Sequence, residues 1–196
     1  KGNSSILFYE YVRLLKELNP KYFLLENVIP IGNWKEVMDD HIGCKGIKIN
    51  SSLFVPQNRE RFYWSNINFK KPIQQEYNFE FQEDVPVKYF ANDNILANEN
   101  RLKFVLSRKN KLCGCLTEAI GRNGSSKEYM SWLGWVNNNK GQIRKPTPLE
   151  CERLQGVLDN YTDSVSDTQR YKMLGNGWTV DVIAYIFKNL KEQWIG

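Results

Sequence analysis

Residues 4–28 read SSILFYEYVRLLKELNPKYFLLENV, and this run predicts a helix followed by a buried strand. The helical part places apolar side chains at the spacing of one helix face, at Leu7, Tyr11, Leu14, Leu15 and Leu18. The pair Asn19-Pro20 ends this pattern, because proline cannot continue a helix. Residues 22–25 then form a short apolar run that ends in the polar pair Glu26-Asn27. A buried parallel strand looks like this when its carboxyl end opens onto a site.

The alternation of helix and strand continues beyond this unit. A second helix is expected at residues 33–42, with Asn33 as its N-cap and Gly43 as its stop. Two further strands are expected at residues 47–50 and 62–66. Alternating helices and strands are typical of an α/β fold.

The middle and the end of the chain differ from each other. From about residue 69 to 140 the pattern dissolves into short mixed stretches, which indicates a lobe of irregular and β structure. Helices return at the end, where Thr147-Pro148-Leu149-Glu150 forms a capping box for a helix that stops at Gly156. A short helix is expected at about residues 167–174, stopped by Gly175, and a last helix begins after Thr179.

The composition is that of a globular, mildly basic protein. The chain has 196 residues and a formal net charge of +5, which favours an acidic partner such as nucleic acid without identifying one. Its four cysteines lack the paired spacing of a zinc site, so we expect reduced thiols and no metal. No apolar run approaches the roughly 20 residues of a membrane span. We therefore expect an intracellular protein with no membrane partner, in the cytoplasm if it is bacterial or from a phage and in the nucleus if it is eukaryotic.

Several short strings acquire meaning only in combination. Glu26-Asn27-Val28 alone is most often an exposed strand end, and a loop with two arginines is usually a solvated charged loop. Here they occur in one order with further strings, LFYE at 7–10, QNRER at 57–61, RKPTPLECERLQG at 144–156 and LGNGWTV at 174–180. This combination resembles the cytosine-5 DNA methyltransferase family.

The resemblance implies a fold and a division of the chain. The expected fold is the C-terminal part of a Rossmann-like class I methyltransferase fold with a small mixed target-recognition lobe. Residues 1–66 would form the second half of the catalytic α/β domain, and residues 67–143 the target-recognition region. Residues 144–196 would form closing helices that return to the catalytic domain.

The family chemistry explains why these residue types occur. Members of the family attack carbon 6 of a flipped cytosine with a cysteine thiolate and transfer a methyl group from S-adenosylmethionine to carbon 5. The resemblance assigns Glu26 to ring nitrogen 3, where an acid assists the attack. It assigns Arg61 to the carbonyl at position 2, and Arg59 to fixing the loop and a phosphate.

The resemblance also implies a cofactor site and a DNA-reading loop. Residues expected to line the S-adenosylmethionine pocket are Leu7, Asn176, Gly177 and Trp178. Trp178, together with FYWSN at 62–66, is more similar to the vertebrate de novo DNA methyltransferases than to most bacterial members. Residues expected to read double-stranded DNA are Arg122, Asn123, Ser125, Ser126 and Lys127, although a polar surface turn is the alternative interpretation.

Three motifs of the family are not found in these residues. The cofactor-binding glycine loop, the acid for the cofactor ribose and the Pro-Cys nucleophile motif should all precede residue 5. The chain is therefore expected to be the C-terminal part of a longer enzyme, one subunit of a split enzyme, or a noncatalytic DNA-binding or regulatory relative. The first is favoured because Glu26 and Arg61 are kept. The N-terminal half is the implied partner, and the chain alone is expected to be inactive.

Overall fold

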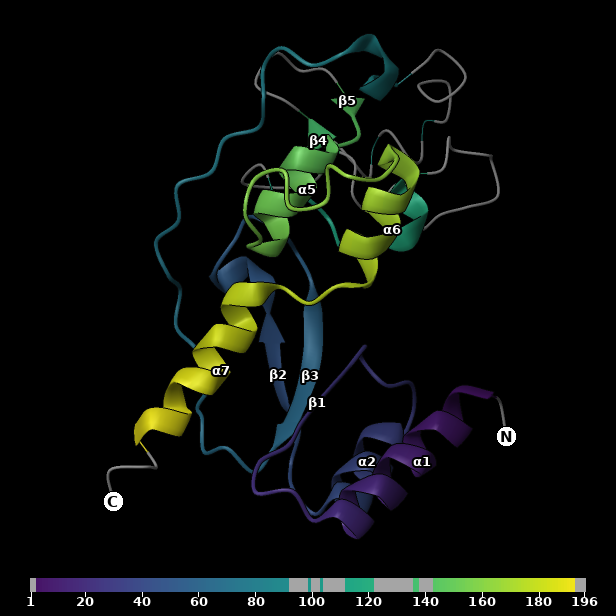
Figure 1. Cartoon of the computed structure of the whole chain (residues 1–196), viewed down its shortest axis with the longest axis vertical. Helices are drawn as coiled ribbons and strands as arrows, with labels where there is room; N and C mark the ends of the chain where they lie inside the picture. The colour runs from purple at the N-terminus through teal and green to yellow at the C-terminus, as the bar shows by residue number, and fades with distance from the viewer. Residues whose placement is uncertain are drawn as a thin grey trace. The chain divides into compact units, whose positions relative to one another are not determined.

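The helix expected at the start of the chain is confirmed as α1 (Asn3–Leu18) in the computed structural model of the protein (Figure 1). The structure describes residues 3–91, 112–121, 136–137 and 143–192, and in addition Glu99 and Lys103. The chain folds into two compact units. The first unit comprises Lys1–Ile49, Glu60–Pro72 and Tyr185–Gly196, and the second comprises Asn50–Arg59 and Ile73–Ala184.

A three-stranded sheet follows α1, with β1 (Leu24–Asn27), β2 (Ile47–Asn50) and β3 (Glu60–Ser65) in the order β1-β3-β2. All three strands were expected. The prediction that β1 is a parallel strand is wrong for its pairing among the described residues. β1 pairs antiparallel with β3, and Asn27 faces Phe62 across the pair. β1 is also only half-buried, because it lies at the edge of this sheet.

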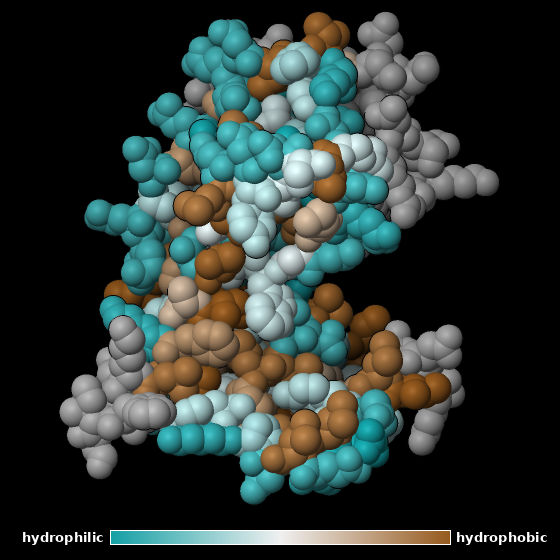
Figure 2. All heavy atoms as spheres, viewed as in Figure 1, coloured by the Kyte–Doolittle hydropathy of each residue, from teal (hydrophilic) through white to brown (hydrophobic). Residues whose placement is uncertain are grey.

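The core of the first unit joins α1, α2 (Trp34–Ile42) and the sheet through Phe8, Val12, Met38 and Trp64. Trp64 has no exposed surface, and its indole nitrogen donates to Asp39 Oδ1 at 2.7 Å. Gly46 is required beside this ring, because a Cβ there would lie 2.5 Å from it. Figure 2 shows apolar side chains gathered over the elements of this unit.

The predicted ends of α2 are confirmed in position. Gly43 ends the helix in the left-handed conformation, with φ of 82°, and its N–H donates to Asp39 O. Asn33 occupies the N-cap position, but its side chain forms no capping hydrogen bond. The position was therefore predictable, whereas the capping bond was not.

The second unit is built around two helices, α5 (Pro148–Gln155) and α6 (Asp167–Asn176). Shorter elements are the 3₁₀ turns η1 (Ser51–Leu53), η2 (Val87–Tyr89) and η4 (Glu118–Gly121) and the strand pair β4 (Val136–Asn137) and β5 (Ile143–Arg144). The core of this unit consists of Tyr89, Cys113, Leu116, Ile120, Cys151, Leu154, Tyr171 and Leu174.

The capping box of α5 is confirmed and is also buried. Thr147 Oγ1 accepts from the N–H of Glu150, and Glu150 Oε2 accepts from the N–H of Thr147. Glu150 also forms an ion pair with Arg144 at 2.7 Å, and neither side chain has exposed surface. Gly156 then ends the helix as predicted, with φ of 72°.

The predicted stop of α6 at Gly175 is wrong. The helix continues to Asn176, and Gly177 is its C-cap. Gly175 serves close packing instead, because a Cβ there would lie 2.2 Å from the backbone carbon of Thr117. The last helix, α7 (Val180–Glu192), begins after Thr179 as predicted. Among the described residues, no helix is long and apolar enough to cross a membrane.

Candidate active site and cofactor turn

Glu26 and Arg61 meet in the first unit because their strands are antiparallel neighbours. Glu26 lies near the carboxyl end of β1, and Arg61 lies near the beginning of β3. The Nε of Arg61 is 2.9 Å from Oε1 of Glu26, and the two side chains are 15% and 16% exposed. Arg61 also donates through NH1 to the carbonyl of Glu60 at 2.8 Å. The structure thus brings together the acid and the guanidinium that the sequence predicted for the cytosine.

This pair offers complementary hydrogen-bonding groups at one edge of the sheet. A guanidinium has five N–H donors and a carboxylate has up to about four acceptor positions, so the two groups are complementary in kind to the polar edge of a heterocycle. A carboxyl group can share a proton with a ring nitrogen, while a guanidinium can donate to a carbonyl oxygen. The arrangement suits a planar heterocycle that presents both groups.

An apolar pocket of about 330 Å³ begins at the end of β1. Its lining comes from α1, α2 and the segment after β1, at Phe8, Asn27, Val28, Ile29, Pro30, Ile31, Trp34 and Met38. Val28 and Ile31 are 55% and 87% exposed, so the segment after Asn27 displays apolar surface. One signal in the sequence could have indicated this pocket, the apolar run VIPI that directly follows Glu26-Asn27.

Arg59 has partners quite different from those of Arg61. Its side chain is buried in the second unit, with the residue only 5% exposed. Its guanidinium donates to the carbonyls of Leu116 at 2.8 Å, Gly177 at 2.9 Å and Gly175 at 3.3 Å. These bonds support the predicted role of Arg59 in fixing its loop, but a guanidinium buried among carbonyl oxygens does not favour the predicted contact with a phosphate.

Gln57 is a buried residue of the same motif, and sequence reasoning assigned it no role. It has no exposed surface, and its Nε2 donates to the carbonyl of Leu154 at 2.8 Å. Its Oε1 accepts from the N–H of Leu116 at 3.1 Å. The only signal for this burial was the apolar pair Val55-Pro56 before it.

The residues predicted for the cofactor are placed as follows. Asn176 is the last residue of α6, and the N–H of Gly177 donates to the carbonyl of Met173 at 2.9 Å. Trp178 follows and is 48% exposed. Leu7, which is 73% exposed, belongs to α1 and to the first unit. An exposed indole next to an exposed amide fits a ligand with a purine ring, because the ring can stack on one and accept a hydrogen bond from the other.

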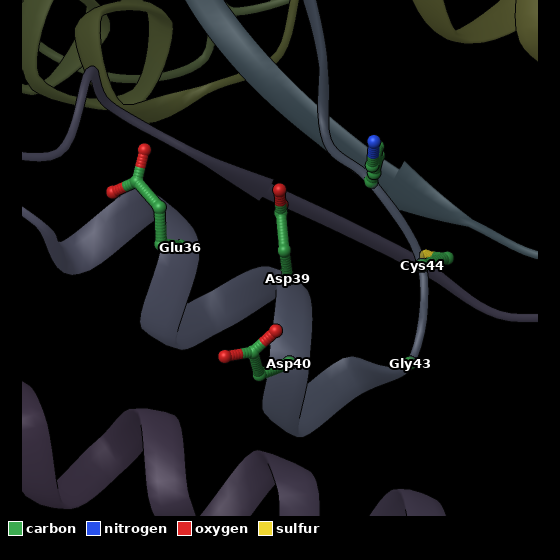
Figure 3. A pocket seen from close by; sticks show the side chains of 6 residues that line it. Glu36, Asp39, Asp40, Gly43 and Cys44 are labelled. Atoms are coloured by element: carbon green, nitrogen blue, oxygen red, sulfur yellow. The ribbon is translucent and has the colours of Figure 1, made fainter.

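The predicted DNA-reading residues Arg122, Asn123, Ser125, Ser126 and Lys127 lie outside the described residues. A further pocket, of about 470 Å³, lies in the first unit beside α2 (Figure 3). It is lined by Glu36, Asp39, Asp40, Gly43, Cys44 and Lys45. The described residues contain no cluster of His, Cys, Asp and Glu suited to a metal ion.

The side chains of this second pocket support the fold of the first unit and are not arranged for catalysis. In Figure 3 Asp39 points from α2 toward the neighbouring strand, whereas Asp40 points away from it. Burial alone would raise the pKa of Asp39, but hydrogen bonds from Lys35, the Gly46 N–H and Trp64 lower it below its usual value. Burial raises the pKa of the Cys44 thiol, so the thiol is not activated as a nucleophile.

Comparison with known proteins identifies relatives. The family model for the C-5 cytosine-specific DNA methylase matches residues 1–37 and 98–192. The type II methyltransferase M1.ScrFI of Lactococcus lactis subsp. cremoris is 30% identical over 216 residues, covering 95% of this chain and 55% of the relative. The type II methyltransferase M.NlaX of Neisseria lactamica is 30% identical over 210 residues, covering 94% and 67%.

Solved structures share the fold at lower identity. The Entamoeba histolytica methyltransferase EhMeth has a TM-score of 0.60 and 19% identity, with 93% of this chain and 69% of that chain covered. The S. pombe Dnmt2 methyltransferase has a TM-score of 0.62 and 19% identity, with 95% and 73% covered.

The chain matches only part of the length of these relatives. The chain spans about half the length of the first of the type II methyltransferases that it resembles, the L. lactis protein. The described residues are mixed α/β, as in the portion of the methyltransferase fold that they match. From its motifs, its fold and these relatives, the chain belongs to the C-5 cytosine-specific DNA methylase family.

Proposed function

We propose that this chain is part of an enzyme that methylates carbon 5 of cytosine in double-stranded DNA, and that it supplies the pocket for the flipped base and the DNA-reading region. The observation that carries this proposal is the ion pair between Glu26 and Arg61 at 2.9 Å. A purely structural relative has no chemical need for a partly buried acid and guanidinium at the open edge of a sheet.

Each member of the pair has a distinct role in the proposal. Glu26 holds a proton at ring nitrogen 3 of the flipped cytosine, which makes carbon 6 easier to attack. Arg61 donates to the carbonyl oxygen at position 2, where negative charge develops, and it disfavours a base without that acceptor. Opening a duplex for the base costs a few kcal/mol, so the pocket must replace the lost stacking and pairing.

The proposed nucleophile is a cysteine in an N-terminal half of the methyltransferase. Cys113 and Cys151 have no exposed surface, and burial raises the pKa of Cys151 well above its usual value. The thiol of Cys115 donates to the carbonyl of Leu116 at 3.4 Å. Buried thiols are poor nucleophiles, which supports a source other than Cys113 and Cys151.

The proposed cofactor residues are Leu7 on α1 and the turn from Asn176 to Trp178. When bound, S-adenosylmethionine supplies the methyl group. The indole of Trp178 would stack on a purine, and the amide of Asn176 would donate to or accept from its polar edge. Gly177 keeps the backbone between these two side chains free of a Cβ.

The proposal is tested with Glu26→Gln and Arg61→Ala in the assembled enzyme. Glu26→Gln should lower single-turnover methyl transfer by about 10² to 10⁴, the range for loss of a general acid, with little change in DNA affinity. Arg61→Ala should weaken both retention of the flipped base and turnover. Radiolabelled methyl transfer and 2-aminopurine fluorescence measure the two effects.

Arg13→Ala is the matched control, because Arg13 forms exposed ion pairs with Glu10 and Glu17 on α1. This variant should keep the wild-type rate. Unchanged single-turnover rates in both site variants would place the base pocket elsewhere. DNA binding without methyl transfer by the assembled wild type would favour the alternative, a noncatalytic DNA-binding or regulatory subunit.

A further inference from the structure

A buried polar cluster surrounds the turn from Asn176 to Trp178 in the second unit. We use this name for five residues that are each at most 5% exposed, Ser51, Gln57, Arg59, Gln155 and Thr179. Their side chains form hydrogen bonds to one another and to backbone carbonyls on both sides of the turn. Buried polar side chains of this kind hold the groups that they contact in one geometry.

Arg59 forms the charged part of this cluster. Its NH2 donates to Gly177 O at 2.9 Å and to Gly175 O at 3.4 Å, while NH1 also donates to Gly175 O at 3.3 Å. The last carbonyls of a helix have no partner within the helix, and a cation at the C-terminus is favoured by the helix dipole. Arg59 therefore anchors the carbonyls on either side of Asn176.

Gln155 and Thr179 contribute further hydrogen bonds around the same turn. Gln155 Nε2 donates to Leu174 O at 2.5 Å and to Gly177 O at 3.4 Å. Thr179 Oγ1 donates to Gln155 Oε1 at 2.9 Å, and Ser51 Oγ donates to Thr179 Oγ1 at 2.9 Å. The carbonyl of Gly177 thus accepts from two side chains that are distant in sequence.

The backbone beneath the turn has little room to adjust. The Cα of Gly175 lies so close to residue 117 that a Cβ would be 2.2 Å from the Thr117 carbon. Loss of the donors would leave buried carbonyls without partners, and the turn would have to move to reach water. Such a movement would displace Asn176 and Trp178, the exposed side chains that the turn carries.

We propose that Arg59, supported by Gln155 and Thr179, is a positioning residue for the cofactor turn, and that it sets the affinity for S-adenosylmethionine without contacting DNA or the base. This inference rests on the proposed function for the identity of the ligand. The guanidinium is suited to the task because its planar fork reaches carbonyls of two segments at once, which the single ammonium of a lysine cannot reproduce.

The first test is hydrogen exchange on the chain itself. Arg59→Met should accelerate exchange at the amide of Gly177, which donates to Met173 O, by about 10- to 100-fold, as expected for the loss of charged hydrogen bonds. Arg59→Lys should restore part of the protection. Arg153→Met is the control, because Arg153 pairs with Asp159 at the surface with 40% of its side chain exposed.

The second test is equilibrium dialysis of labelled S-adenosylmethionine with the chain combined with the N-terminal half. Arg59→Met should raise the Kd for S-adenosylmethionine by about 10- to 100-fold and leave the Kd for DNA unchanged. In steady-state methylation the KM for the cofactor should rise more than kcat falls. Thr179→Val, which keeps the shape and removes the hydroxyl, should give a smaller rise in the same direction.

The outcomes separate this inference from the proposed function. Wild-type exchange at Gly177 in Arg59→Met and Thr179→Val would overturn the positioning role, whatever the enzyme does. An unchanged cofactor Kd, or a DNA Kd that rises instead, would overturn the assignment to the cofactor. Failure of the assembled wild type to methylate DNA would count against the proposed function, and exchange at Gly177 would still decide the positioning role. Thr179→Val provides this measurement if Arg59→Met does not fold.

Discussion

Arg59 and Arg61 are separated by one residue and have unrelated partners. Arg61 pairs with the carboxylate of Glu26, whereas Arg59 donates to backbone carbonyls at the end of α6. The two arginines thus carry the same charge and lie almost together in one motif, but their side chains have different roles. The difference arises from burial, because a buried guanidinium must satisfy its donors with protein acceptors.

Arg122 carries a prediction at the residue scale, from its place in the Arg122-Asn-Gly-Ser-Ser-Lys127 string. If Arg122 reads a guanine edge, Arg122→Ala should relax preference at one position by about 1–3 kcal/mol. Lys127→Ala should instead weaken all sequences alike if Lys127 contacts only phosphate. Bisulfite sequencing of a methylated library with randomised flanks measures both, and an unchanged profile in Arg122→Ala would reduce this string to a phosphate contact or a surface turn.

At the scale of elements, α6 is defined by its packing as much as by its sequence. Gly175 would normally be expected to end a helix, but here it lies one residue before the helix end and touches the segment around Thr117. Glycine at this point lets two backbones approach more closely than any side chain would permit. The same close approach brings α6 to the base of the segment that leads into the predicted DNA-reading region.

Gly175→Ala should therefore destabilise the second unit. A Cβ 2.2 Å from the Thr117 backbone carbon cannot be accommodated without moving one of the two segments. We expect a loss of about 1–3 kcal/mol or more in the free energy of unfolding, the cost of overpacking a core. Urea denaturation followed by circular dichroism measures the loss. Met173→Ala, an exposed change on the same helix, should have little effect, and equal stability of Gly175→Ala and wild type would contradict the packing.

The hydrogen bonds between Glu152 of α5 and the loop that follows this helix predict that the free energy of unfolding depends on pH. Glu152 has no exposed surface and accepts from the N–H of Asn160 and from the N–H and hydroxyl of Thr162, and it also pairs with Arg170 at 2.9 Å. Burial alone would raise the pKa of Glu152, but these hydrogen bonds lower it below the ordinary value of 4.5. A lowered folded pKa contributes stability above pH 4.5 that is lost as the pH falls through the folded value.

Glu152→Gln should remove this part of the acid dependence. Unfolding free energies measured in urea between pH 7 and pH 3 should fall less steeply below the ordinary carboxyl pKa in the variant than in the wild type. Glu80→Gln, an exposed change in the second unit, should leave the slope as it is. Parallel curves for Glu152→Gln and wild type would show that Glu152 does not titrate with folding.

At the scale of the whole molecule, the sheet of the first unit ends at β1, whose outer edge has no strand partner among the described residues. An open strand edge exposes backbone donors and acceptors, and it is normally covered. Apolar side chains of α1 are also exposed, including Leu7 and Leu18 at 73% each. These features support the proposal that an N-terminal half completes the catalytic domain.

The corresponding prediction is complementation. The chain alone should transfer no methyl group, and addition of the N-terminal half should restore transfer and raise the unfolding midpoint of the chain, because binding to the folded state stabilises it. Radiolabelled transfer to DNA and thermal unfolding measure the two effects. Transfer by the isolated chain above background would contradict the prediction. An N-terminal half with its cysteine replaced by serine is the control and should stabilise without restoring activity.

The sequence alone determined the family, the order of the main elements and several of their ends. Local signals suffice for this, because the Thr147 capping box, the left-handed glycines at 43 and 156 and the apolar spacing of α1 act within a few residues. The proximity of Glu26 and Arg61 also followed from the motifs, by resemblance. The antiparallel pairing that creates this proximity did not follow, since a four-residue apolar run does not specify its partner.

Only the tertiary structure decided which polar residues are buried and what they hold. Arg59 and Gly177 are 118 residues apart in sequence, and Ser51 and Thr179 are 128 residues apart. A residue type reports the hydrogen bonds that a side chain can form, but burial dictates which it must form, and burial depends on segments that meet only in the folded chain. For that reason the sequence named Arg59 as a candidate site residue, while the fold determined that it donates to backbone carbonyls on either side of Asn176.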